Sequence, residues 1–214
     1  MDSETQTLRR LRKYEAEHVV YSSIGEEPRM DLLAPFGPLI GRTRIPDDTV
    51  RYLNSEADRI LTPGKGAEFL IPEATCRTGQ HSLMDCVAHG IELYVRACEG
   101  ESVRHIDFDV FWIVSQYAGT PSPVHFHSGE LSGVAYLKVP DVDPEQEQQS
   151  YISGRQAGHI NFLIGGKQRF SRSLISFKPV VGDLYIFPGW LLHGAEPFQG
   201  TGERRSLAFN SRLP

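Results

Sequence analysis

DFDVFWIVSQYAG, residues 107–119, marks the point where the apolar residues of this sequence change from a helical spacing to strict alternation. Successive residues of a strand face opposite sides, so alternation predicts a half-buried β-strand. Six short strands without intervening helices indicate an antiparallel sandwich or barrel. The five later segments are LSGVAYLKV (131–139), HINFLIG (159–165), SLISFKP (173–179), DLYIFP (183–188) and SLAFNSRL (206–213).

The first half of the chain has a helical spacing of apolar residues instead. Three segments show it, at residues 8–18, 47–61 and 82–98, the last of them opened by Ser82 as a capping residue. We expect a helical and irregular region over residues 1–106 that packs on a mainly β core over residues 107–214. At this length the two form a single structural domain of the α+β class.

Composition and charge exclude several classes of protein. The net charge of −5 provides no basic field for a phosphate backbone, so we expect no nucleic-acid partner. The three cysteines form no CxxC pair, which favours a reducing compartment. No signal peptide or membrane-spanning run is evident, and we expect a cytoplasmic protein without a membrane partner. The oligomeric state stays open, with a homodimer as one expectation.

Two histidines separated by one residue stand where a strand begins. His125 and His127, in SPVHFHSGE, project to the same face of an extended chain and can present two imidazoles to one point. His193 follows 66 residues after His127, at a turn beyond the strand DLYIFP. Three imidazoles from neighbouring strands would hold a divalent ion and leave coordination positions open. Taken alone, such a pair is more often an exposed strand end than a metal site.

An arginine and a serine share one face of the last predicted strand. Arg204 and Ser206, in GERRSLAFN, could bind a carboxylate, because the planar guanidinium grips two oxygens and the hydroxyl adds a third hydrogen bond. The alternative is that Arg204 and Arg205 are solvated charges at a sheet edge.

At these residues the sequence resembles the iron(II)- and 2-oxoglutarate-dependent oxygenases, in the prolyl-hydroxylase-like branch and its little-characterised bacterial and phage members. The resemblance covers roughly residues 108–212. It implies a double-stranded β-helix, or jelly roll, buttressed by the helices of the first half. The segments that carry it are PVHFHSGELSGVAYLKVP, AGHINF, VVGDLYIFPGWLLHGAEP and ERRSLAFN, in the family's order.

The resemblance also implies a set of site residues. His125 and His193 match two iron ligands, and His127 stands where the family has an acidic ligand. Glu130 is the alternative to His127 as the third ligand. Arg204 and Ser206 match the clamp for the far carboxylate of 2-oxoglutarate. Tyr136 is a further candidate contact to this co-substrate, and Gln116 or Tyr117 on the earlier strand could also line the pocket or touch it. Core packing is the competing interpretation for all three.

The implied activity is that of an oxidoreductase that uses Fe(II), 2-oxoglutarate and O₂. Such a dioxygenase hydroxylates an unactivated carbon of a small molecule, amino acid or peptide, with release of succinate and CO₂. One rival is a cupin-type metalloprotein, in which Glu130 would be a true ligand and no dicarboxylate clamp is needed. Another is a non-catalytic binding module whose histidines hold no metal.

Overall fold

The structure is a computed structural model that describes residues 30–33, 37–79, 81–143, 156–166, 169 and 173–213. The helical pattern predicted at residues 8–18 lies outside the described residues. Within the described ranges, no helix combines the length and the apolar character that crossing a membrane requires.

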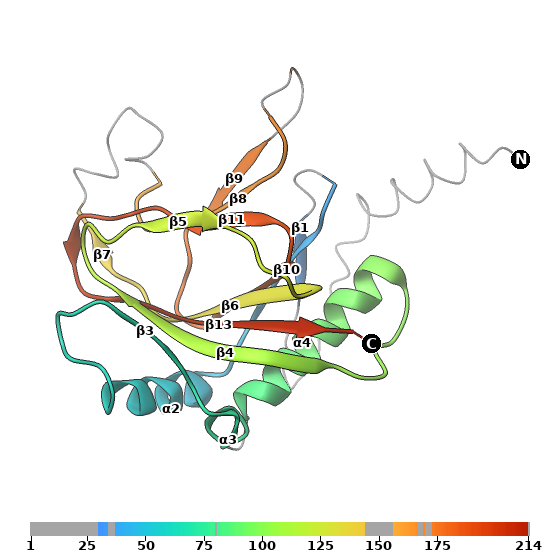
Figure 1. Ribbon diagram of the computed structural model, residues 1–214, viewed down its shortest axis with the longest axis horizontal. Helices are drawn as coiled ribbons and strands as arrows, with labels where there is room; N and C mark the ends of the chain where they lie inside the picture. The colour runs from blue at the N-terminus through green and yellow to red at the C-terminus, as the bar shows by residue number, and fades with distance from the viewer. Residues whose placement is uncertain are drawn as a thin grey trace, which may run out of the picture.

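Two antiparallel sheets lie one above the other, as the predicted sandwich requires (Figure 1). The larger sheet has the order β1 (Asp31–Leu33), β2 (Ile40–Arg44), β10 (Asp183–Pro188), β6 (Leu131–Lys138), β13 (Arg204–Arg212), β4 (Asp107–Gln116) and β3 (Ala67–Leu70). The smaller sheet has the order β5 (Ser122–His125), β11 (Leu192–Ala195), β8 (Ile160–Leu163) and β9 (Leu174–Phe177). A two-stranded sheet joins β7 (Asp141–Val142) and β12 (Gly200–Thr201).

All six predicted strands are present, as β4, β6, β8, β9, β10 and β13. The first half was expected to be helical and irregular, yet it also contributes β1, β2 and β3 to the larger sheet. Glycine and arginines in β2 hide its alternation. Pro123 weakens the strand signal of β5, which lies at a sheet edge, where a proline costs no ladder hydrogen bond.

The two longer helices pack on the face of the larger sheet that points away from the smaller one. α2 (Asp47–Asp58) starts after Pro46, so Asp47 and Asp48 lie in its first turn, where carboxylates favour the positive end of the helix dipole. α4 (Leu83–Glu99) has the predicted cap, because Ser82 Oγ accepts a hydrogen bond from the Asp85 amide. A short α3 (Glu73–Cys76) lies between them in the chain.

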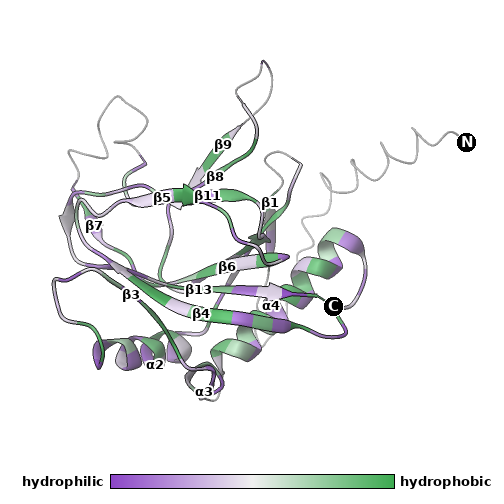
Figure 2. Ribbon diagram, in the orientation of Figure 1, coloured by the Kyte–Doolittle hydropathy of each residue, from purple (hydrophilic) through white to green (hydrophobic). Residues whose placement is uncertain are grey.

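Two apolar clusters fill the molecule, one on each side of the larger sheet. The helix-side cluster joins α2 and α4 to the sheet, with Leu53, Ile91 and Leu207 at its centre. Figure 2 shows hydrophobic and polar residues alternating along both helices, as this one-sided packing requires. The second cluster lies between the two sheets and includes Phe162 and Tyr185. The larger sheet is therefore covered on both faces.

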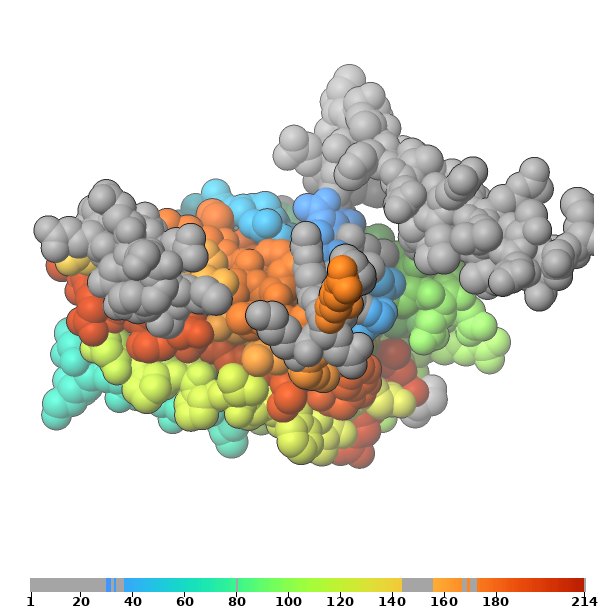
Figure 3. Space-filling model, turned by 90° about the horizontal axis from the view of Figure 1, so that it is seen from above, coloured from blue at the N-terminus to red at the C-terminus, as the bar shows by residue number. Residues whose placement is uncertain are grey.

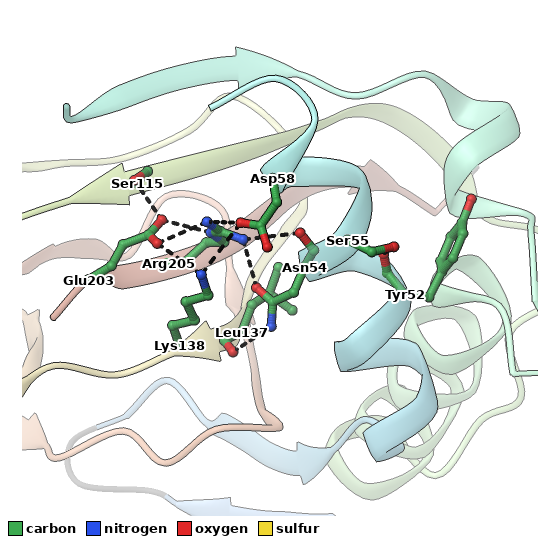
Figure 4. Close-up of polar contacts among 9 residues, drawn as sticks. All are labelled: Tyr52, Asn54, Ser55, Asp58, Ser115, Leu137, Lys138, Glu203 and Arg205. Carbon is green, nitrogen blue, oxygen red and sulfur yellow. Dashed lines mark hydrogen bonds and ion pairs between the residues drawn. The ribbon is translucent and has the colours of Figure 1, made fainter. Parts of the chain in front are cut away.

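A polar network crosses the helix-side face of the larger sheet (Figure 4). Arg205 is 2% exposed and donates hydrogen bonds from Nε and Nη2 to the two carboxylate oxygens of Glu203, at 2.7 and 2.8 Å. Its Nη2 also donates to Asp58 Oδ1 of α2 at 2.7 Å. Lys138 of β6 lies within ion-pair distance of both carboxylates. Ser115 Oγ of β4 completes the set by donating to Glu203.

This network predicts an acid-sensitive contribution to stability. Burial opposes ionisation of Glu203, but hydrogen bonds from Arg205 and Ser115 outweigh it, and the pKa of Glu203 lies below its ordinary value of 4.5. The hydrogen bond from Arg205 likewise lowers the pKa of Asp58. A carboxylate whose pKa is lowered by folding stabilises the fold above its unfolded pKa, and this stabilisation is lost as the pH falls through the folded value.

We therefore expect Glu203→Gln to lower the free energy of unfolding at pH 7 by roughly 1–3 kcal/mol and to flatten its fall below about pH 4.5. Urea unfolding at several pH values measures both effects. Glu68→Gln, on the exposed strand β3, is the matched control. If the free energy of unfolding depends on pH equally in the unaltered protein and in Glu203→Gln, the contacts of the Glu203 carboxylate do not stabilise the fold.

Candidate metal centre

Three histidines converge between the two sheets. The ring centroids of His125 and His193 lie 4.4 Å apart, those of His125 and His127 4.9 Å, and those of His127 and His193 5.1 Å. One nitrogen of each ring lies within 4.8 Å of the corresponding nitrogens of the other two. Nitrogens at these separations can bind one metal ion together.

Strand pairing sets two of these histidines side by side. β5 and β11 run antiparallel, and His125 stands directly opposite His193 in their register. Figure 3 shows this sheet from outside, with β5 in yellow-green beside β11 in orange-red. Directly opposite residues of two strands point to the same face, here toward the larger sheet.

His127 is held by the turn that follows β10. Its backbone amide donates to Gly189 O at 2.8 Å, and the Gly189 amide donates to Glu130 O at 2.8 Å. A Cβ at position 189 would lie 2.0 Å from Gly129 O, so only glycine permits this approach. The turn PGW and the segment HFHSGE thus fit against each other, and this contact fixes the third histidine.

Backbone carbonyls orient two of the imidazoles. His125 Nδ1 lies 2.7 Å from Pro123 O, and His193 Nδ1 lies 2.9 Å from Leu191 O. Because a carbonyl only accepts, each Nδ1 must carry the proton. The lone pair of each neutral ring is then on Nε2, free for a metal ion.

The surroundings of the histidines favour their neutral form. His193 is buried, and desolvation, aided by the nearby His125 and His127, lowers its pKa to about 4, although the hydrogen bond to Leu191 opposes this shift. Desolvation and the proximity of His125 also lower the pKa of His127. The rings of Trp112 and His127 meet edge to face, with centroids 5.5 Å apart. Neutral imidazole is the form that binds metals.

Glu130, the alternative third ligand, points elsewhere. Its side chain is exposed, and its Oε2 accepts a hydrogen bond from the Leu213 amide at 2.5 Å. It does not belong to the convergent group, which contains His127 instead.

A buried arginine faces the same pocket from the larger sheet. Arg204 is 1% exposed, and its Nε and Nη2 donate to Gln116 Oε1 at 3.0 and 2.8 Å. Its Nη1 donates to Glu196 O at 2.7 Å. Burial lowers the pKa of Arg204. Among the residues that the structure describes, no carboxylate forms an ion pair with this guanidinium, so its charge is available to an anionic ligand.

The serine and tyrosine predicted to accompany Arg204 are its neighbours. Ser206 stands opposite Tyr136 in the register of β13 and β6, and Arg204 stands opposite Gln116 in that of β13 and β4. The pocket contains about 560 Å³ of empty space including its open mouth. Its wall includes the three histidines, Arg204, Ser206, Tyr136, Gln116, Trp112, Val114 and Phe187.

The structure thus brings together the six residues proposed as ligands or clamp, and leaves Glu130 outside. The alternative in which Arg204 and Arg205 are solvated edge charges is wrong, because both are buried and β13 is flanked on both sides by other strands. Sequence reasoning missed the contact of Trp112 with His127. The sequence does hold an indication of this contact. Trp112 stands four residues before Gln116 on β4, and this even spacing places both side chains on the pocket face.

Comparison with known proteins finds one matching family model. The model of a family described as "Putative 2OG-Fe(II) oxygenase" matches residues 110–210, a segment that contains every residue of the convergent site. A search of curated proteins found no match.

Several solved structures share the fold. The viral collagen prolyl hydroxylase vCPH of Paramecium bursaria Chlorella virus-1 is 13% identical with a TM-score of 0.54, over 82% of this chain and 96% of that one. HygX of Streptomyces hygroscopicus, with nickel and 2-oxoglutarate bound, is 14% identical with a TM-score of 0.55, over 83% and 82%. A Pseudomonas putida prolyl-4-hydroxylase is 17% identical with a TM-score of 0.52, over 82% and 93%.

At these identities the likeness shows the fold, and it confirms the jelly roll predicted from the sequence. The family match supplies what the fold alone does not. Residues 110–210 match the model of a 2OG-Fe(II) oxygenase family, and the chain shares its fold with solved prolyl hydroxylases.

Proposed function

We propose that this protein is an iron(II)- and 2-oxoglutarate-dependent dioxygenase that hydroxylates an unactivated carbon. One observation carries the proposal. Three convergent imidazoles and a buried arginine without a described acidic partner face each other across a single pocket. A metal-binding site paired with a carboxylate-binding site is what a 2-oxo dicarboxylate requires.

The residues fit an iron(II) ion. Imidazole nitrogen is a common ligand of iron, and His125, His127 and His193 would occupy one side of the ion and leave the other positions open. When bound, iron and 2-oxoglutarate together activate O₂ for oxidation of the substrate, with succinate and CO₂ as the co-products.

The protein's own groups bind and orient the co-substrate. Arg204 would hold the far carboxylate, with the hydroxyls of Ser206 and Tyr136 beside it, while Gln116 keeps the guanidinium in place. The apolar side chains of the pocket wall exclude water from the reacting centre. Gln116 and the Glu196 carbonyl hold the guanidinium of Arg204 in place, which lowers the cost of ordering it on binding.

The placement of Glu130 argues against the cupin alternative, which needs that residue as a ligand. Substrates of two classes stay open in this proposal, small molecules and peptide side chains. HygX has been solved with hygromycin B bound, and vCPH is a collagen prolyl hydroxylase. The free thiols of the three cysteines favour the cytoplasm as the compartment.

Formation of succinate tests the proposed function. The protein is incubated with iron(II), 2-oxoglutarate and O₂, and succinate is measured with and without a chelator. We expect iron-dependent succinate formation, slow without the proper substrate and accelerated by it. Iron-loaded protein that forms no succinate under any substrate panel, together with no binding of 2-oxoglutarate, would point to a non-catalytic binding module.

The three histidines carry no charge when they bind a metal ion. We therefore expect the binding of iron(II) and the binding of 2-oxoglutarate to be strongly coupled. Three neutral imidazoles give the ion no negative charge, so the carboxylate of 2-oxoglutarate is the first anion beside it. We expect 2-oxoglutarate to tighten iron(II) binding more in the unaltered protein than in His127→Asp, by roughly fivefold or more, or about 1 kcal/mol. Anaerobic competition with a coloured chelator, with and without 2-oxoglutarate, measures both factors.

His127→Asn is the control, since it also changes the ligand but adds no charge. Equal coupling in the unaltered protein and in His127→Asp would show that ligand charge does not govern the affinity of this site.

A further inference from the structure

We propose that Asn54 of α2 is a positioning residue for the carboxylate site, because it fixes a β-bulge directly behind the clamp residues. This inference rests on the proposed function, since it assigns a role in binding 2-oxoglutarate. Asn54 lies on the helix side of the larger sheet and does not line the pocket.

The bulge lies between β6 and β13. Arg205 pairs with Lys138 and Ser206 pairs with Tyr136, so Leu137 is an extra residue without a counterpart on β13. Consecutive side chains of a regular strand face opposite sides, yet Leu137 and Lys138 both lie on the helix side, in the apolar cluster and in the polar network respectively. Tyr136 faces the pocket.

The bulge decides which residues of β6 enter the pocket. Without the extra residue, Lys138 would share the pocket face with Tyr136 and would stand near Arg204. With it, the Lys138 ammonium lies 3.2 Å from Glu203 on the opposite face. Arg204 is therefore the one arginine or lysine among the described residues that line the pocket, and a dicarboxylate meets a single cation there.

The side chain of Asn54 forms hydrogen bonds with both β6 and β13 at the bulge (Figure 4). Asn54 Nδ2 donates to Leu137 O, the carbonyl of the bulge, at 3.0 Å. Asn54 Oδ1 accepts from Arg205 Nη1 at 2.9 Å, and the backbone oxygen of Asn54 lies 3.2 Å from the same nitrogen. The amide thus ties the extra residue of β6 to the residue of β13 that adjoins Arg204.

The surrounding network makes this tie rigid. Arg205 also bonds Glu203 and Asp58, and Lys138 pairs with the same two carboxylates. The two cations and two anions balance, and the two buried members, Arg205 and Glu203, are each held by several partners. Displacing Asn54 therefore shifts Leu137 and Arg205, and with them Tyr136 and Arg204, their neighbours in the chain.

The metal ligands should not sense such a shift. His125 and His193 belong to β5 and β11 of the smaller sheet, and His127 is held by the Gly189 turn. Loss of Asn54 should consequently weaken binding of the far carboxylate of 2-oxoglutarate and leave iron binding unchanged. General destabilisation of the fold would not separate these two effects.

The test compares two variants with a neighbouring control. Asn54→Ala removes both side-chain bonds, whereas Asn54→Asp keeps the acceptor for Arg205, removes the donor to Leu137 and adds one negative charge beside the guanidinium. Ser55→Ala is the control, because Ser55 Oγ donates to a backbone oxygen within α2, Tyr52 O. Anaerobic titrations of the full chain give the affinities for iron(II), for 2-oxoglutarate and for 2-oxovalerate, which ends in a methyl group instead of the far carboxylate.

We expect both Asn54 variants to bind 2-oxoglutarate about tenfold more weakly, the equivalent of one weakened charge-assisted hydrogen bond. Their affinities for iron(II) and 2-oxovalerate, and all affinities of Ser55→Ala, should stay within about twofold of the unaltered protein. Unchanged 2-oxoglutarate affinity in either variant, or an equal loss for 2-oxovalerate, would overturn the inference. Failure of the unaltered protein to bind 2-oxoglutarate would instead overturn the proposed function.

Discussion

Replacing His193 by alanine is expected to lower the affinity for iron(II) by roughly 100-fold or more and to abolish succinate formation. His193 is the most buried member of the triad, and the Leu191 carbonyl orients its free Nε2 toward the other two rings. Alanine leaves two nitrogen donors, both on one short segment of chain. Anaerobic titration with iron(II) measures the change.

His159→Ala is the matched control for this variant. His159 precedes β8, and its Nδ1 lies 3.2 Å from a backbone oxygen, Ala157 O, but it does not belong to the convergent group. The control should bind iron as the unaltered protein does. Equal iron(II) affinities for His193→Ala and the unaltered protein would show that the three histidines do not form the iron site.

Replacing Arg204 by alanine is expected to weaken 2-oxoglutarate binding by roughly 100-fold, about 3 kcal/mol, because two charge-assisted hydrogen bonds to the far carboxylate are lost. Arg204→Lys should recover only part of this loss, since an ammonium keeps the charge but lacks the planar pair of donors. The affinity for iron(II) should not change in either variant. Titration of 2-oxoglutarate into iron-loaded protein separates the two quantities.

Arg212→Ala provides the control on the same strand, because this exposed arginine pairs with Asp109 away from the pocket. A lysine variant that binds 2-oxoglutarate as tightly as the unaltered protein would contradict the bidentate clamp. An alanine variant that does so would show that Arg204 has only a structural role beside Gln116.

The fold was predictable where local periodicity matches burial. β4, β6 and β13 carry long alternating patterns and lie at the centre of the larger sheet, so the sequence reveals them. β5 is short, contains Pro123 and lies at an edge, so its strand character depends on pairing with β11, a contact from a distant part of the chain. Such pairings leave little trace in the sequence nearby.

The site was predictable to the extent that its residues carry unusual chemistry. Histidines at strand spacing and an arginine two residues before a serine point to a metal and a carboxylate. The burial of Arg205 was not predictable, because it depends on how α2 brings Asn54 and Asp58 over the sheet. The orientation of Glu130 was not predictable either, since its partner is a backbone amide close to the end of the chain.

The central claim is that one pocket binds iron through three histidines and 2-oxoglutarate through Arg204. Anaerobic titration of 2-oxoglutarate into the iron(II)-loaded protein tests it most directly, by the visible charge-transfer absorption of the chelate. We expect an absorption that saturates, disappears in His193→Ala and requires far more 2-oxoglutarate in Arg204→Ala. Protein that holds iron(II) yet develops no absorption at high 2-oxoglutarate would contradict the account.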